Sequence, residues 1–307
     1  MTEGAAYPGA MHDGLGQHAP PTHVVAHLSD THLLAGGALL GGAIDTAAHL
    51  RDALARLELA APAADALVVS GDCTDLGEPD AYRLLQEIVE PVAERMGAIV
   101  VYAAGNHDER EPMWHALHGI ASDAPYDHVH DVGGLRIVSL DSSLAGFHHG
   151  GFDEGQAQWL ADALATPAEH GTLLVMHHPP LPYRARILQV LEFQDEPRLA
   201  EVLDGSDVRA ILSGHLHVNG SGTFAGVPVV LANATSYADD LAAGPTAFTG
   251  IDGAQSANVL EVYAHTVAHS VVPGQVHPSL SPLPAGLHAE LAALDPAARI
   301  ERFSRKR

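Results

Sequence analysis

Residues 24–32 read VVAHLSDTH, and this stretch sets a pattern that the rest of the chain repeats. It begins with a largely apolar run, which predicts a buried strand, and the strand ends in a polar loop that carries Asp30 and His32. Apolar residues then recur at helical spacing over residues 44–59, where we expect a helix. A strand, a polar loop and a helix in this order are typical of an α/β unit.

The same order returns further along the chain. Strands are expected over residues 66–69, 99–103, 172–176 and 208–212, and helices over residues 79–95, 112–117, 154–164 and 197–203. Gly133 and Gly134 separate two alternating runs and predict a hairpin, and a spacing of two recurs over residues 223–231 and 258–272. We therefore expect an α/β fold, built as a mixed sandwich in one domain.

Polar side chains follow five of the expected strands at the point where each strand ends. These residues are Asp30 and His32, Asp72, Asn106 and His107, His177, and His215 and His217. Taken alone, each is more often a turn residue or a packed imidazole. Because the carboxyl ends of strands in an α/β sheet meet at one edge, the whole set predicts a multinuclear metal site there.

The types of side chain narrow the choice of metal. With His107 left aside, two carboxylates, one amide and four imidazoles, without a thiolate, suit Mn, Fe, Co or Zn. This is enough for two ions if one carboxylate bridges them. Two divalent ions and two carboxylates leave a charge of about +2, which a hydroxide and a phosphodiester anion would neutralise. Phosphate chemistry is therefore the expected reaction class.

The overall composition excludes other classes. The chain has 307 residues and a formal net charge of -23, so it would repel a nucleic acid polymer or an anionic membrane at long range. Cys73 is the only cysteine. The first 22 residues lack the basic and apolar regions typical of a secretory signal, and no apolar run reaches the length that a transmembrane helix needs. We expect a cytoplasmic protein that binds a small-molecule substrate.

The motifs resemble a known family. Five blocks occur in the order of the calcineurin-like metallophosphoesterase superfamily: Asp30-x-His32, Gly71-Asp72, Gly105-Asn106-His107-Asp108, His177 and Gly214-His215-x-His217. Further stretches resemble bacterial class III cyclic nucleotide phosphodiesterases, namely residues 28–33, 77–79, 135–137, 148–150, 177–180, 207–212 and 253–255. The resemblance implies a four-layer αββα sandwich with two mixed β-sheets, a homodimer, and two transition-metal ions, Mn and/or Fe with Zn or Co as alternatives.

The resemblance also divides the chain. It implies a metallophosphoesterase catalytic domain over residues 23–272, between a flexible N-terminal segment of residues 1–22 and a C-terminal extension of residues 273–307. In that extension we expect a short helix near residues 287–294, followed by a basic end. A disordered tail and a tether to an acidic partner face or to anionic lipid are the alternatives for this extension.

Roles follow from the resemblance by position. Asp30, His32 and His217 would hold the first ion, Asn106, His177 and His215 the second, and Asp72 would bridge them. The catalytic residues would be His107, which also contacts the phosphate, and Asp108, which would fix the His107 tautomer or else serve as a turn or cap residue. The remaining substrate-binding residues would be Asn106, His148 and His149, although the two histidines also fit a mobile surface loop.

The expected substrate is a phosphodiester. Phosphatases of this superfamily carry an arginine shortly after the second aspartate block, where this chain has Leu76. Losing a fixed guanidinium disfavours a monoester dianion more than a diester monoanion. We expect hydrolysis of 3',5'-cyclic nucleotides such as cAMP to nucleoside 5'-monophosphates by a metal-bridging hydroxide, with 2',3'-cyclic nucleotides as further substrates. A broad phosphodiesterase or phosphomonoesterase and a non-catalytic metal-binding scaffold are the alternatives.

Overall fold

The computed structural model describes residues 15–16, 18–275, 284 and 286–306, so most of the expected N-terminal segment, residues 1–14 and 17, lies outside the described residues. The first sheet has the order β13-β12-β1-β2-β3. Its strands are β1 (His23–Leu28), β2 (Ala66–Val69), β3 (Ile99–Tyr102), β12 (Ser256–Val262) and β13 (Val267–Pro273). The three N-terminal strands run parallel, and β12 and β13 are antiparallel to their neighbours, so the sheet is mixed.

The second sheet has the order β4-β5-β6-β7-β9-β8. Its strands are β4 (His128–Val132), β5 (Leu135–Ser139), β6 (Thr172–Val175), β7 (Val208–Ser213), β8 (Gly220–Phe224) and β9 (Val227–Leu231). The four inner strands run parallel, whereas both edge strands are antiparallel. The hairpin expected at Gly133 and Gly134 joins β4 to β5, and the second expected hairpin joins β8 to β9.

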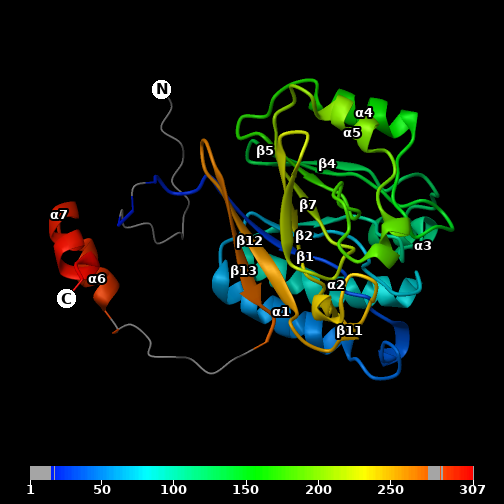
Figure 1. Ribbon diagram of the computed structural model, residues 1–307, viewed down its shortest axis with the longest axis horizontal. Helices are drawn as coiled ribbons and strands as arrows, with labels where there is room; N and C mark the ends of the chain where they lie inside the picture. Colours follow the sequence, from blue (N-terminus) through cyan, green and yellow to red (C-terminus); the bar gives the residue numbers. More distant parts are fainter. Residues whose placement is uncertain (1–14, 17, 276–283, 285, 307) are drawn as a thin grey trace.

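Helices cover the outer face of each sheet. The first sheet carries α1 (Thr46–Ala60), α2 (Pro79–Met96) and α3 (Arg110–His118), and the second carries α4 (Glu154–Leu164) and α5 (Glu196–Leu203) (Figure 1). The ends follow local chemistry: Asp153 and Gln156 form a capping box at α4, and Gly97 ends α2 in a left-handed conformation. The first helix was expected from residue 44, but α1 begins two residues later. It begins there because the Asp45 carboxylate accepts the N–H of Ala48 and caps the helix.

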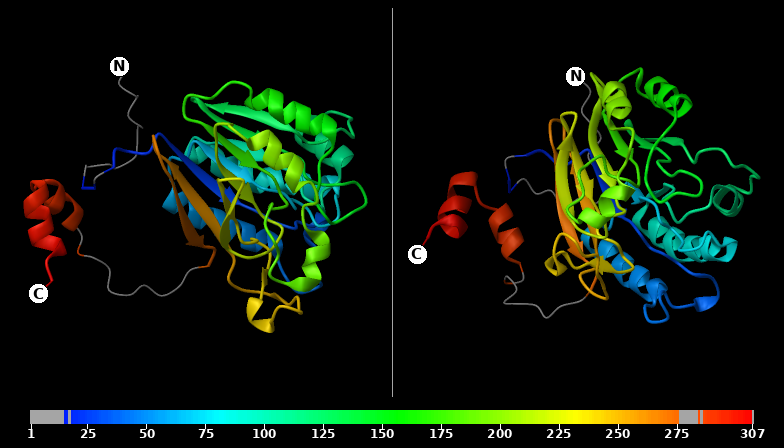
Figure 2. Two further views of the ribbon diagram at one scale, coloured as in Figure 1. Left: turned by 45° about the horizontal axis from the view of Figure 1, so that its top comes forward. Right: turned by 45° about the vertical axis from the view of Figure 1, so that its right-hand side comes forward.

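Three buried apolar layers hold these elements together. One lies between α1–α3 and the first sheet, one between α4–α5 and the second sheet, and a third between the two sheets, where Val68, Leu173 and Leu212 are fully buried. Figure 2 shows the resulting succession of helices, sheet, sheet and helices. The expected α/β fold with a four-layer αββα arrangement is confirmed.

Short elements complete the described chain. They are η1 (Ala35–Gly37), η2 (Arg186–Leu191), η3 (Leu241–Ala243), β10 (Ala238–Asp239), β11 (Gly250–Ile251), α6 (Leu287–Ala292), α7 (Pro296–Arg299) and η4 (Ile300–Ser304). The short helix expected in the C-terminal extension corresponds to α6. Within the described ranges, no helix combines the length and the hydropathy that a membrane crossing requires.

Candidate dinuclear metal centre

Five loops meet at one end of the sandwich, and each follows the carboxyl end of a parallel strand. They come after β1, β2, β3, β6 and β7. Backbone hydrogen bonds join the loops to each other: Asp30 N–H donates to Gly71 O at 3.0 Å, and Gly214 N–H donates to His177 O at 3.1 Å. The two sheets therefore present their polar loops to one common site, as the positions of these residues in the sequence predict.

The backbone of these loops is unusual. Seven non-glycine residues of the described chain have a positive φ, and five of them are expected metal ligands: Asp30, His32, Asp72, His215 and His217. This left-handed region is uncommon for non-glycine residues and costs free energy, so it persists only where the surroundings enforce it. Such residues cluster at functional sites, which sets these positions apart from ordinary turns.

Two glycines allow the loops to approach closely. A Cβ atom at Gly105 would overlap the backbone nitrogen and carboxylate of Asp72, and one at Gly214 would overlap Ser29 and the Asp30 carboxylate. Any larger residue at either position would push the β2 or β1 loop away. The glycines beside the expected ligands are thus part of the site's geometry.

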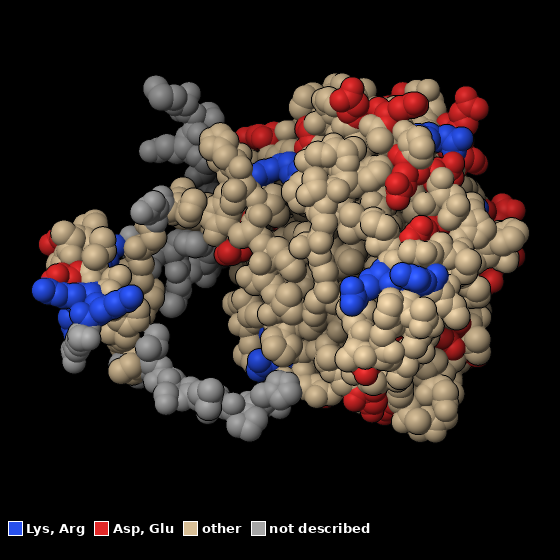
Figure 3. All heavy atoms as spheres, in the orientation of Figure 1, with Lys and Arg blue, Asp and Glu red and all other residues tan. Residues whose placement is uncertain are grey.

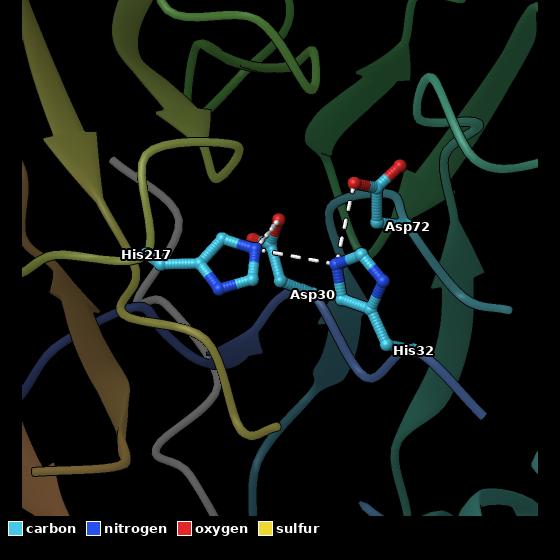
Figure 4. A group of neighbouring side chains, drawn as sticks. All are labelled: Asp30, His32, Asp72 and His217. Carbon is cyan, nitrogen blue, oxygen red and sulfur yellow. Dashed lines mark hydrogen bonds and ion pairs between the residues drawn. The ribbon is translucent and has the colours of Figure 1, made fainter. Parts of the chain in front are cut away.

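The first group of side chains is Asp30, His32, Asp72 and His217, which Figure 4 shows pointing toward one another. The Nε2 atoms of His32 and His217 lie 3.2 Å apart, His217 Nε2 lies 3.3 Å from Asp30 Oδ1, and His32 Nε2 lies 3.5 Å from Asp72 Oδ2. Two imidazole nitrogens bound tetrahedrally to one ion at 2.0–2.1 Å would be about 3.3 Å apart. The spacing therefore fits a cation between them.

The second group is Asp72, His177 and His215, and it shares Asp72 with the first. His177 Nε2 lies 3.3 Å from Asp72 Oδ2, yet it is buried without a hydrogen-bond partner, and so is Asn106 Oδ1. A buried polar atom without a partner is costly. Because an imidazole nitrogen and an amide oxygen can both bind a cation, and His177 Nε2 adjoins the shared Asp72 carboxylate, the residues present fit a second metal ion.

Hydrogen bonds at the far side of the rings set which nitrogen faces the site. His177 Nδ1 is 2.9 Å from Ser70 O, and His217 Nδ1 is 2.9 Å from Tyr237 O. A carbonyl oxygen only accepts, so each Nδ1 carries a hydrogen, and Nε2 is the nitrogen that would bind an ion. His32 Nδ1 is held in the same way by Asp75 Oδ1 at 3.0 Å.

The electrostatics of the site favour positive charge. Burial alone would raise the pKa of Asp30 and Asp72, but the neighbouring histidines hold both carboxyl pKa values below their ordinary value. Although burial opposes it, Asp72 and Asp30 raise the pKa of His177 to about 9. Two buried ionised carboxylates thus attract a cation to the position that the His177 Nε2 atom faces.

The expected link between Asp108 and His107 is wrong. The buried Asp108 carboxylate accepts hydrogen bonds from the backbone N–H groups of Cys73, Thr74 and Gly105 at 2.9–3.1 Å, and from the Tyr82 hydroxyl at 3.0 Å. It therefore joins the β2 and β3 loops, which agrees with the alternative interpretation of a turn or cap residue. Adjacency in the sequence misled the expectation, because the Asp108 carboxylate is taken up by backbone N–H groups of both loops.

Asp75 contacts His107 instead. His107 Nδ1 lies 2.9 Å from Asp75 O and 3.6 Å from Asp75 Oδ1, and the same carboxylate holds His32. Although burial opposes it, the charges of Asp72 and Asp75 raise the pKa of His107. The sequence analysis missed Asp75, and the spacing Asp72-Cys73-Thr74-Asp75 is the signal that could have found it.

A cavity of about 270 Å³ opens above the two groups. Seven of the expected residues line it, namely His32, Asp72, Asn106, His107, His148, His215 and His217. The rest of the lining belongs to no sequence motif and consists of Leu188, Leu191, Tyr237 and Phe248. His148 reaches the cavity and its Nδ1 lies 3.0 Å from Asn106 Nδ2. His149 is not among the lining residues, and its ring contacts Phe147 instead.

Similarity to known proteins agrees with this geometry. Residues 23–219 match the calcineurin-like phosphoesterase family. The chain is 47% identical over 262 residues to a probable cyclic nucleotide phosphodiesterase of Rhodococcus erythropolis, which covers 85% of this chain and 87% of that one. It is 46% identical over 258 residues to a cAMP/cGMP dual specificity phosphodiesterase of Mycobacterium tuberculosis, covering 84% and 81%.

Solved structures support the fold. A dimetal phosphatase from Danio rerio superposes with a TM-score of 0.59 at 16% identity, covering 83% of this chain and 97% of that one. A purple acid phosphatase from yellow lupin superposes with a TM-score of 0.55 at 13% identity, covering 83% and 52%. With its motifs in order, its ligand-type side chains grouped around Asp72 and its matching sequence, the chain belongs to the calcineurin-like metallophosphoesterase family.

Proposed function

We propose that this protein is a dinuclear metal-dependent phosphodiesterase that hydrolyses 3',5'-cyclic nucleotides such as cAMP to nucleoside 5'-monophosphates. The observation that carries the proposal is the pair of ligand groups sharing Asp72 at the floor of a small cavity. The names of the two relatives at 47% and 46% identity support the choice of substrate.

The charge of the cavity favours a diester over a monoester. Among the described residues, no lysine or arginine lines it. Leu76, at the position where related phosphatases carry an arginine, is exposed. The positive charge for the substrate must then come from the ions, which leaves about +2 after two carboxylates are counted. This net charge suits a diester monoanion better than a monoester dianion, because the dianion needs further cationic side chains.

The size and surface favour a small substrate. A cavity of about 270 Å³ is close to the lower end of ligand pockets, which start at roughly 300 Å³. On the face drawn in Figure 3, acidic side chains lie mainly along the top and right of the body, and basic atoms form no continuous track. A nucleic acid strand would need such a track, so a free nucleotide is the better fit.

Each side chain has a role in this proposal. Asp30, His32 and His217 would hold one ion, Asn106, His177 and His215 the other, and Asp72 both. Bound ions would supply Lewis acidity and a low-pKa water as the nucleophile. His107 would give a proton to the leaving 3' oxygen, since its Nδ1 is fixed by Asp75 O and the ring lines the cavity. Asp108 would keep the β2 and β3 loops in register.

The Gly-rich loop after β5 contributes to substrate binding in this proposal. His148 lines the cavity and lies beside both His107 and Asn106, with its ring centroid 5.2 Å from that of His107. It would hydrogen-bond a phosphate oxygen. For His149, substrate binding stays a prediction, and its absence from the cavity wall weighs against it.

One assay separates the proposal from its alternatives. Protein loaded in turn with Mn, Fe, Zn or Co is given cAMP, 2',3'-cAMP, bis-p-nitrophenyl phosphate and p-nitrophenyl phosphate. We expect cAMP hydrolysis to AMP, with Mn or Fe giving the highest rate. Turnover of the monoester alone would refute the proposal and leave a phosphatase. Metal binding without turnover of any of the four would favour the scaffold alternative.

A homodimer and a cytoplasmic location also stay predictions. Light scattering on the purified protein should give twice the 32.1 kDa chain mass. Cell fractionation should recover the protein with the cytoplasmic markers.

A further inference from the structure

We propose that one wall of the cavity is a nucleobase subsite that holds a purine by apolar stacking and does not read the polar edge of the base. The wall consists of Leu188, Leu191, Tyr237 and Phe248. It adjoins the metal-ligand side of the same cavity at Tyr237, whose ring centroid lies 4.2 Å from that of His217. This inference rests on the proposed function, because it assigns the part of a cyclic nucleotide that the metal centre does not contact.

The two leucines come from η2, and the geometry of that helix selects them. A 3-10 helix has three residues per turn, so residues three apart lie on one face. Leu188 and Leu191 line the cavity, whereas Ile187 and Val190, also three apart, are 58% and 73% exposed. One face of η2 therefore contacts the substrate space, and the other face contacts solvent.

The two aromatic residues come from one short ribbon. Tyr237 directly precedes β10 and Phe248 precedes β11, and Ala238 pairs with Ile251 in this ribbon. A Cβ atom at Gly250 would lie 3.0 Å from the Tyr237 ring, so the glycine lets the ring pack closely on the ribbon. The Arg186 N–H donates to Pro245 O at 2.7 Å and ties η2 to the same loop. These contacts hold the two segments that carry the four side chains next to each other.

The wall is almost free of groups that could read a base. Its one polar side-chain atom is the Tyr237 hydroxyl, since the other three side chains are hydrocarbon. The other polar lining residues, such as Asn106 and His215, belong to the metal-ligand and phosphate side. Apolar and aromatic groups accept any base face, and the larger face of a purine gains more from them.

Two substitutions in the wall and two matched controls test the proposal. We expect Phe248→Ala to lower kcat/KM for cAMP between about 5-fold and 100-fold, mainly through KM, the range found when a stacking side chain is removed. Leu191→Ala should lower it about 3-fold to 5-fold, in line with the loss of about one buried methylene group. Phe147→Ala and Val190→Ala remove exposed side chains of the same kinds outside the cavity wall and should stay within about twofold.

The substrate series identifies the base as the group concerned. Phe248→Ala should lower kcat/KM much less for methyl riboside 3',5'-cyclic phosphate, which lacks a base, than for cAMP. Wild-type kcat/KM values for cAMP and cGMP should agree within about fivefold, because one bidentate edge contact would already separate them by more than that. The values for cCMP and cUMP should be lower.

Several outcomes would overturn the proposal. If Phe248→Ala lowers kcat/KM equally for cAMP and the abasic substrate, the wall stabilises the fold and does not bind the base. If kcat/KM for cAMP does not fall, the wall does not contribute to substrate binding. A larger difference between cAMP and cGMP would reveal a group that reads the base edge. If wild-type protein hydrolyses no cyclic nucleotide, the proposed function fails by itself. Calorimetric titration of metal-loaded wild-type and Phe248→Ala proteins with cAMP then decides on the subsite, and equal affinities would refute it.

Discussion

Two groups of histidines lie in different parts of this protein, and their surroundings differ. His32, His177, His215 and His217 surround the buried carboxylates Asp30 and Asp72. The other group, which we call the distal aromatic cluster, lies on α3 and β4 and in the segment between them, and it consists of Trp114, His118, Tyr126, His128 and His130. In the described chain, the groups with ligand atoms close enough to hold a metal do not include the distal histidines.

The difference shows what marks a metal centre. In the distal cluster burial lowers the pKa of His128 to about 4, with further lowering by His118 and His130. In the centre burial also lowers the pKa values of His32 and His215, but there the carboxylates raise the pKa of His177 to about 9. Left-handed backbone and closely approaching glycines occur at the centre as well. Histidines alone predict packing, whereas histidines with carboxylates on strained loops predict cation binding.

The largest effect is expected for Asp72→Ala, since this carboxylate belongs to both ligand groups. The variant should lose both ions and lower kcat/KM for cAMP by more than roughly 100-fold, the scale of removing one group that stabilises charge in the transition state. Metal analysis by mass spectrometry, together with the cAMP assay, measures both effects. A variant that retains two ions per chain would contradict the shared role of Asp72.

His107→Ala should affect the rate and leave the metal content unchanged. The ring lines the cavity, and His107 forms a third group of ligand-type side chains with His32 and Asp75. The proposed ligand sets do not include His107, so its loss would remove a proton donor only. We expect a fall in kcat of about 100-fold to 10,000-fold, as is usual for a general acid. An empty metal site in this variant would show that His107 is a ligand.

Asp75→Ala should weaken the first ion through His32. The Asp75 carboxylate fixes His32 Nδ1 at 3.0 Å, and such orienting partners typically contribute about 10-fold to 100-fold in metal affinity or activity. Chelator competition on the Mn-loaded protein gives the affinity. Asp75→Asn keeps an acceptor oxygen and should recover most of the loss. If both variants bind metal like the wild type, Asp75 does not position His32.

The smallest effect is expected in the distal aromatic cluster. His128→Phe should leave the metal content and the cAMP rate within about twofold of wild type. The pKa of folded His128, about 4, is below its unfolded value of about 6.5, so the unfolded chain takes up the proton first as pH falls. Wild type should therefore lose more stability than the variant between pH 7 and pH 5 in urea unfolding. An equal loss in both proteins would show that His128 is not buried in its neutral form.

Much of the fold and of the centre is predictable from the sequence, because the information is local. Strand ends such as Leu28 and Val69 are followed at once by their ligand-type residues, so the order of elements places Asp30 and Asp72 at one edge. The αββα layering followed from the resemblance, and the three separate apolar cores confirm it.

The remaining features depend on three-dimensional contacts. Asp108 follows His107 in sequence, but its carboxylate turns to the N–H groups of Cys73 and Gly105, which no spacing rule reveals. Tyr237 and Phe248 reach the cavity through a ribbon with strands of two residues, too short for a period to be recognised.

The central claim is that two ions share Asp72 beneath the cavity. Anomalous diffraction from crystals grown with Mn²⁺ tests it directly. We predict two peaks about 3.5–4 Å apart, one on each side of the Asp72 carboxylate. A single peak, or strong peaks at the distal aromatic cluster with none at Asp72, would contradict the account.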